Sequence, residues 1–144
     1  MTYNQIVTAI QTILQNHKMI KEVRFASPTQ WLNWDSVPNF PVASFVINRG
    51  QINIGRELVY TIEMWMLDKS GVDGEYETDV TSDMHSIACD IVQNLRQGFQ
   101  PYRLSTSVSW DAVSEKFEDY LSGVKFSFDF SVVREYDSCD TPIN

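Results

Sequence analysis

The feature that most constrains the fold is an alternating segment within residues 123–134. From Val124 to Val132 every second side chain is apolar, and the positions between are polar. Because successive side chains of a β-strand point to opposite faces of a sheet, the pattern predicts a strand with one buried face. The side chains expected on that face are Val124, Phe126, Phe128, Phe130 and Val132, which alternate with Lys125, Ser127, Asp129 and Ser131.

An earlier pair of segments predicts a hairpin. Residues 42–48 are rich in β-branched and aromatic side chains, residues 49–56 look like a hairpin tip, and residues 57–67 return. A strand that is apolar on both faces is either central in a sheet or covered by a partner. The returning strand is of this kind, with Leu58, Tyr60, Ile62, Met64 and Met66 on one face and Val59, Thr61, Glu63, Trp65 and Leu67 on the other.

Two segments have the three- and four-residue spacing of amphipathic helices. The first begins at Thr2, which fits a capping box with Gln5, and closes near Lys18. The second is expected to be capped by Thr78 and ended by Gly98. Their apolar stripes are Tyr3, Ile6, Val7, Ile10, Ile13 and Leu14 in the first, and Val80, Met84, Ile87, Ala88, Ile91, Val92 and Leu95 in the second.

The other segments are shorter or irregular. Residues 21–26 predict a short extended segment, and the weak alternation of residues 103–110 predicts an edge strand. The prolines within residues 27–41 argue against a helix or a central strand, so we expect a long ordered loop there. Residues 68–76 contain Gly and Asp and predict a further loop.

Together these elements predict a single α+β domain over residues 1–135, with residues 136–144 as an extended C-terminal tail. We expect a mainly antiparallel sheet with a long hairpin arm and two main helices packed on one face. The 144 residues and the hydrophobic fraction of 43% suffice for one core and are too few for two comfortable domains.

The charge balance disfavours several classes of partner. The formal net charge is −8, and the eleven Lys and Arg residues are scattered singly. Proteins that bind nucleic acid normally present a basic patch to the phosphates, so specific nucleic-acid binding and anionic membrane binding are not expected. No apolar stretch approaches the roughly 20 residues of a membrane span. The first residues lack the basic region of a signal peptide, which predicts a cytosol-like compartment.

The residue types that carry chemistry form no pattern of an active site. His85 and Cys89 are four residues apart on the predicted second helix and share a face, but no third ligand or orienting carboxylate is signalled. Cys89 and Cys139 are predicted to be free thiols. We therefore predict no enzyme, no cofactor and no metal site. The spacing of an EF-hand loop is also missing among Asp68, Ser70, Asp73 and Glu75.

Surplus apolar surface is the more informative signal. Trp31 and Trp34 lie in the Pro-rich loop, and Trp65 faces the second side of its strand. Exposed apolar patches commonly mark protein contacts, although the loop could instead fold over the core and hide its rings. Ile52 and Ile54 alternate with polar residues at the hairpin tip, which predicts an apolar edge on a projecting arm.

The order and spacing of several segments extend this interpretation. They are the N-terminal helix, Pro41-Val42-Ala43, the return strand LVYTIEMWMLD at 58–68, MHSIACDIV at 84–92, the YLSGVKFSF segment at 120–128 with a Leu-x-Gly turn, and Asp137-Ser138-Cys139. Over residues 3–139 this layout resembles the tail-terminator and neck (head–tail connector) proteins of tailed phages. It is especially similar to versions from phages of Bacteroidetes hosts, including crAss-like phages.

The resemblance implies a structural virion protein made in the bacterial host cytoplasm. It implies a hexameric or dodecameric ring of copies of this chain, which contacts portal, adaptor or tail proteins and lets DNA pass without specific binding. Carried over to this chain, the hairpin at 48–56 is the arm that meets the neighbouring subunit. The loop at 68–76 and the tail at 136–144 reach adjacent rings or line the channel.

The residues assigned to these contacts follow from the surplus apolar surface and the resemblance together. The expected subunit interface contains Trp31, Trp34, Arg49, Ile52, Ile54, Arg56 and Trp65, and the expected inter-ring contacts are Asp73, Tyr76, Tyr136 and Ile143. The alternative is a small acidic protein-binding module or inhibitor that acts on one cytosolic partner. Oligomeric state separates the two, because a ring protein is symmetric.

Overall fold

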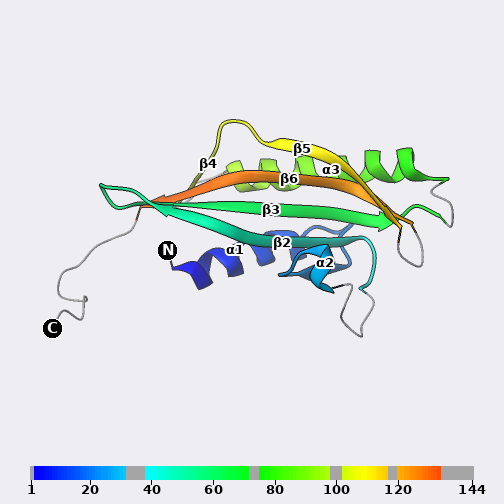
Figure 1. Ribbon diagram of the computed structural model, residues 1–144, viewed down its shortest axis with the longest axis horizontal. Coiled ribbons are helices and arrows are strands. Elements are labelled where there is room, and N and C mark those ends of the chain that lie inside the picture. The colour runs from blue at the N-terminus through cyan, green and yellow to red at the C-terminus, as the bar shows by residue number, and fades with distance from the viewer. Residues whose placement is uncertain (1, 32–37, 72–74, 98–101, 117–119, 134–144) are drawn as a thin grey trace.

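A computed structural model of the chain describes residues 2–31, 38–71, 75–97, 102–116 and 120–133. The predicted tail at 136–144, the predicted helix end at Gly98 and Cys139 lie outside these residues. The elements are, in order, α1 (Tyr3–Gln15), β1 (Glu22–Arg24), α2 (Pro28–Trp31), β2 (Val42–Ile52), β3 (Glu57–Lys69), α3 (Glu77–Arg96), β4 (Tyr102–Leu104), β5 (Ser109–Lys116) and β6 (Tyr120–Val133) (Figure 1).

The strands form one sheet, with the order β1-β2-β3-β6-β4 and with β5 also paired to β6. All pairs are antiparallel except β1 with β2. The predicted α+β domain with a mainly antiparallel sheet is therefore confirmed. β4 and β5 lie along the same edge of β6, because β4 pairs near Phe130 and β5 pairs with residues 120–127.

The main core lies between the two long helices and one face of the sheet. The alternation in β6 and β3 buries the predicted face, and α1 and α3 contribute their predicted stripes to the same cluster, except for Tyr3, which is 45% exposed. Each large apolar side chain that is fully buried contributes about 1.5–3 kcal/mol. The members of this core that are least exposed include Ile6, Ile10, Leu14, Phe45, Ile62, Met64, Ile91 and Phe130.

The two long helices begin in different ways. The capping box of α1 is confirmed: Thr2 N–H donates to Gln5 Oε1 at 2.8 Å, and Gln5 N–H donates to Thr2 Oγ1 at 3.2 Å. The prediction that Thr78 caps the second helix is wrong, because α3 begins at Glu77 and Tyr76 occupies the cap without a side-chain hydrogen bond. Acidic residues in the first turn of α3 favour this start electrostatically.

The opposite face of the sheet is partly covered by the chain itself. A second, smaller apolar cluster contains Ala26, Val42, Trp65, Leu67 and Leu121, with Phe40, Val46 and Val113 packed against it. The rest of this face is mainly polar, although Val59 and the 67% exposed Val133 also lie on it. Lys125 Nζ lies 3.6 Å from Glu63 Oε1, and Thr61 Oγ1 donates to Asp129 Oδ1 at 2.9 Å.

Several predicted boundaries differ from the structure. Residues 27–41 are not loop throughout, because Pro28 opens the short helix α2, where its missing N–H has no cost. Residues 103–110 do not form one strand, and the edge is divided into β4 and β5. Leu121 to Gly123 lie inside β6 rather than in a turn. Gly123 fits there because a Cβ would approach Met66 O to 1.8 Å.

Candidate functional site

The hairpin of β2 and β3 is longer than predicted, and its distal half leaves the body of the domain. Pairing continues out to Ile52 and Leu58, so the predicted tip is largely strand. Figure 1 shows the hairpin reaching beyond both α1 and α3. Gly55 and Arg56 have φ values of 95° and 72°, which close a tight turn, and Asn53 N–H donates to Glu57 O at 2.9 Å. The arm is thus a structured extension of the sheet.

The tip of this arm is apolar and carries cationic side chains. Ile52 is 84% exposed and Ile54 is fully exposed. The side chains of Arg49 and Arg56 are exposed beside them. These arginines give the arm a charge opposite in sign to the formal net charge of −8 of the whole chain, so the arm complements an acidic surface.

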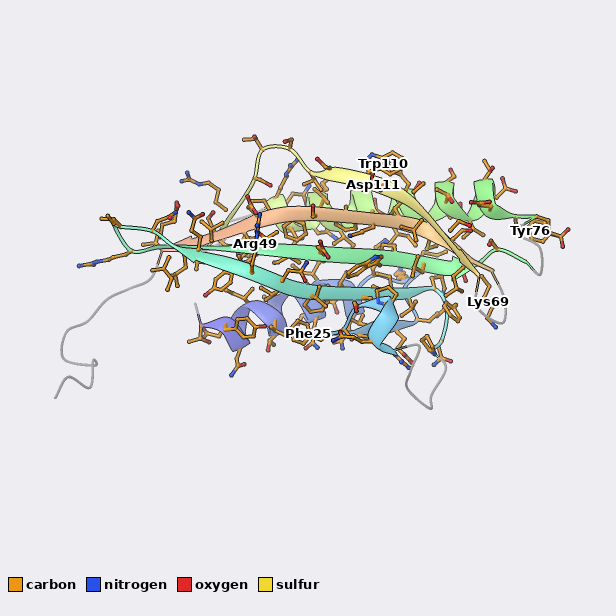
Figure 2. The ribbon with its side chains drawn as sticks, in the orientation of Figure 1. Phe25, Arg49, Lys69, Tyr76, Trp110 and Asp111 are labelled. Atoms are coloured by element: carbon orange, nitrogen blue, oxygen red, sulfur yellow. The ribbon has the colours of Figure 1, made fainter. Side chains whose placement is uncertain are left out.

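Other predicted contact residues are distributed differently. Trp65 is only 9% exposed, because it packs into the second cluster, so little of its surface remains for a neighbouring subunit. Trp31 lies in α2, but its side chain, like Trp34, Asp73, Tyr136 and Ile143, lies outside the described residues. Tyr76 is 57% exposed, at the end of the molecule opposite the hairpin tip (Figure 2).

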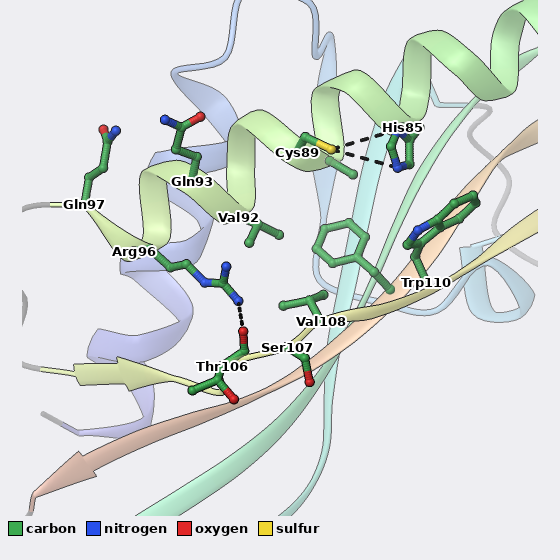
Figure 3. A pocket seen from close by; sticks show the side chains of 12 residues that line it. His85, Cys89, Val92, Gln93, Arg96, Gln97, Thr106, Ser107, Val108 and Trp110 are labelled. Atoms are coloured by element: carbon green, nitrogen blue, oxygen red, sulfur yellow. Dashed lines mark hydrogen bonds between the residues drawn. The ribbon is translucent and has the colours of Figure 1, made fainter.

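A groove of about 640 Å³ lies between α3 and the segment that joins β4 to β5 (Figure 3). Its apolar lining includes Val92, Val108 and Phe126. At one end, the Arg96 guanidinium donates to the carbonyl oxygens of Ser105 and Thr106 at 3.1 and 3.0 Å. These bonds hold the connecting segment against the helix, so the groove has a fixed wall.

The other end of the groove contains the predicted helix face of His85 and Cys89. Cys89 Sγ lies 3.9 Å from both ring nitrogens of His85, and the His85 ring packs on Trp110 with centroids 4.6 Å apart. Because the sulfur is equally far from both nitrogens, at 3.9 Å, it makes no short hydrogen bond directed at either one. Among the described residues no group of three metal-ligating side chains occurs, and no carboxylate contacts His85. The pair therefore offers contact surface.

Sequence reasoning missed Trp110 and the groove. Trp110 is 51% exposed on β5, where it pairs with Phe126 and packs its ring against that of His85. The sequence contains one usable signal, a tryptophan on a predicted edge strand, where a large ring has few neighbours. The groove is assembled from α3, the segment between β4 and β5, β5 and β6, which come together through the packing of α3 on the sheet and the pairing of β5 with β6.

Two titratable groups near the sheet ends have shifted pKa values. Burial raises the pKa of the Asp68 carboxyl, and the charge of Asp83 adds to the rise, while the N–H of Lys69 opposes it. Burial also raises the pKa of the Tyr102 hydroxyl, whose ring stacks on Phe130 at 4.2 Å. Both shifts come mainly from desolvation, which is typical of packing rather than of an acid–base pair.

The sequence matches no protein-family model and no curated protein. Within the ranges that the structure describes, none of the helices combines the length and the apolar character needed to cross a membrane.

Proposed function

We propose that this chain is a structural virion protein of a tailed phage, a ring-forming subunit of the neck or tail terminator that joins portal to tail. The observation that carries the proposal is the arm, which holds two exposed isoleucines on a structured hairpin outside the body of the domain. The resemblance of the sequence layout to phage neck proteins supports the assignment to a phage neck or tail. The proposed partners are further copies of this chain in a hexameric or dodecameric ring, and portal, adaptor or tail proteins.

The energetics of the arm favour a partner. Burying one isoleucine side chain contributes about 1.5–3 kcal/mol, so Ile52 and Ile54 together represent a substantial driving force that the monomer leaves unused. A hairpin with a defined turn also loses little conformational entropy when it docks. Repeated around a ring, one such contact for each subunit is enough to bias assembly.

The distribution of charge supports a ring through which DNA passes without being held. The chain is acidic overall, and its basic residues do not cluster. An acidic wall repels the phosphate backbone and leaves the duplex free to slide. The proposed location is accordingly the virion, after synthesis in the host cytoplasm.

The first test is the molecular mass of the purified protein by light scattering across a wide range of concentration. A discrete species of six or twelve subunits supports the ring. A strict monomer at every concentration contradicts self-assembly and favours the alternative function, a small acidic module or inhibitor that binds one cytosolic partner. The groove beside Trp110 is the surface that such a module would use.

A further inference from the structure

The sheet has an open edge on each side. β1 pairs only with the first three residues of β2, so residues 45–52 have no strand on their outer side within the described part of the chain. On the other side β5, which has eight residues, pairs among the described strands only with β6. The register of β2 shifts between Ile47 and Arg49, so residues 49–52 are the part of this edge that keeps one register along the arm. Their outward N–H and C=O groups and those of β5 can pair with another strand.

Strand direction makes these edges compatible with each other. Along β2, β3, β6 and β5 every pair is antiparallel, so β2 and β5 run in opposite directions. If β5 of a second copy is placed beside β2, the alternation continues and both sheets keep the same face toward their helices. Because the contact joins two different edges, it is heterologous, and its repetition closes a ring or extends a filament.

Charge sets the register of this pairing. Arg49 pairs with Thr61 in its own sheet, and Asp111 pairs with Lys125, which places both side chains on the face away from the helices. Both are exposed, and neither forms an ion pair within the part of the chain that the structure describes. Arg49 opposite Asp111 of the next copy gives Arg49 an oppositely charged neighbour across the strands and places Asp111 between Arg49 and Lys125 of its own sheet.

The same register brings the apolar groups together. Three residues beyond Arg49, Ile52 comes opposite Val108, which forms part of the groove wall. One residue beyond Arg49, Gly50 comes opposite Trp110, so the half-exposed indole lies against a position with no side chain. Ile52 and Leu58 share the helix side of the sheet, which is the side on which the groove lies.

We infer that the arm of one copy binds the β5 edge and the adjoining groove of the next copy, through antiparallel pairing of β2 with β5. Ile52 enters the groove beside Val108 and Trp110, and Arg49 pairs with Asp111. This inference rests on the proposed ring function and assigns the site on the neighbour that receives the arm. The occupant of the groove is a second copy of this chain.

Cysteine cross-linking tests the register directly. In a Cys89→Ser, Cys139→Ser background, Ile52→Cys protein is mixed with Val108→Cys protein and oxidised. Paired strands bring the two Cα atoms within the roughly 4.4–6.8 Å that a disulfide requires, so a covalent dimer is expected. The matched control replaces Val108→Cys by Tyr76→Cys, an exposed position at the opposite end of the molecule, and it should give no dimer above background.

Charge reversal tests the same contact without disulfide chemistry. Arg49→Asp and Asp111→Arg are each expected to raise the midpoint concentration for assembly about tenfold or more, because each places like charges opposite one another. The combination Arg49→Asp with Asp111→Arg should recover most of the loss. Lys18→Asp, an exposed residue outside the sheet with the same change in charge, is the control and should have little effect.

The outcomes separate this inference from the function on which it rests. A wild-type ring with the specific cross-link and with rescue by the double reversal supports both. If the wild type forms a ring, but the Ile52→Cys and Val108→Cys proteins give no dimer and neither single charge reversal changes assembly, the arm-to-β5 contact is overturned. The ring function then still stands. A wild type that stays monomeric and gives no cross-link overturns both.

Discussion

The two ends of the β2–β3 ladder differ in what covers them. At the body end, Phe45, Met64 and Met66 are at most 1% exposed under the helices. At the arm end, Ile52 on the same ladder is 84% exposed. Between the two ends, the ring of Tyr3 in α1 packs edge-on against Tyr60 with the centroids 6.3 Å apart. Similar apolar side chains thus stabilise the fold at one end and are free for a partner at the other.

Truncating one apolar side chain at each end should give the largest difference in stability between the two ends. Phe45→Ala removes a ring from a fully buried site and should lower the free energy of unfolding by about 3–5 kcal/mol. Ile52→Ala should change it by less than about 0.5 kcal/mol, because the side chain is already in water. Urea unfolding of both variants measures the difference, and similar losses would show that the arm is part of the core.

The two strand glycines give a second, smaller contrast. A Cβ at Gly123 would lie 1.8 Å from the backbone oxygen of Met66, so Gly123→Ala must force β3 and β6 apart and should cost about 2–3 kcal/mol. At Gly50 the nearest atom, Val59 O, is 3.1 Å away, and Gly50→Ala should cost less than about 1 kcal/mol. Thermal melting monitored by circular dichroism ranks the two, and an equal or reversed ranking would contradict this account.

Two hydroxyl hydrogen bonds extend the contrast to polar groups. Ser122 Oγ donates to Ser70 Oγ at 2.8 Å, and both residues are fully buried, so Ser122→Ala should cost about 1–3 kcal/mol. The Thr61–Asp129 bond, at 2.9 Å on the open face, is exposed, and Thr61→Ser, which keeps the hydroxyl, is the control for Thr61→Ala. We expect Thr61→Ala to cost less than about 1 kcal/mol. A larger drop in the denaturant midpoint for Thr61→Ala than for Ser122→Ala would show that the sheet face around Thr61 is buried.

The smallest effect concerns pH at the body end. Burial, with the charge of Asp83, raises the pKa of Asp68 in the folded protein, so the folded state favours the protonated carboxyl. Ionised Asp68 therefore lowers the free energy of unfolding. This loss is absent below the ordinary aspartate pKa and fully present above the raised pKa. Asp68→Asn should therefore melt slightly higher than wild type at neutral pH and equally at low pH. Melting curves between pH 3 and 8 check this, and a lower melting temperature for Asp68→Asn at neutral pH would contradict it.

Periodicity predicted much of the fold, because burial on one face leaves a direct trace in the sequence. The strands around Met64 and Phe128 and the stripes of both long helices follow from it. The burial of Trp65 could not be predicted in the same way. A tryptophan on the second face of a strand gives the same sequence pattern whether it is buried by the chain's own second cluster or by a partner. Thr78 was a stronger cap by residue type than Tyr76, yet the helix begins between them at Glu77.

Of the candidate site, one part could be predicted from the sequence and one part could not. The arm was predictable, because alternating Ile52 and Ile54 beside the Gly-containing turn are local in sequence. The groove was not, because Val92, Val108 and Phe126 come together only through the packing of α3 on the sheet and the pairing of β5 with β6. No local pattern reports such a juxtaposition.

The central claim is that the arm serves assembly and not folding, and the Ile52→Asp, Ile54→Asp double variant tests it most directly. Its melting temperature and its mass by light scattering are measured beside wild type, with melting compared at the lowest usable concentration, where assembly contributes least. The account predicts an unchanged melting temperature and loss of the assembled species. A clear drop in melting temperature, or assembly equal to that of wild type, would contradict it.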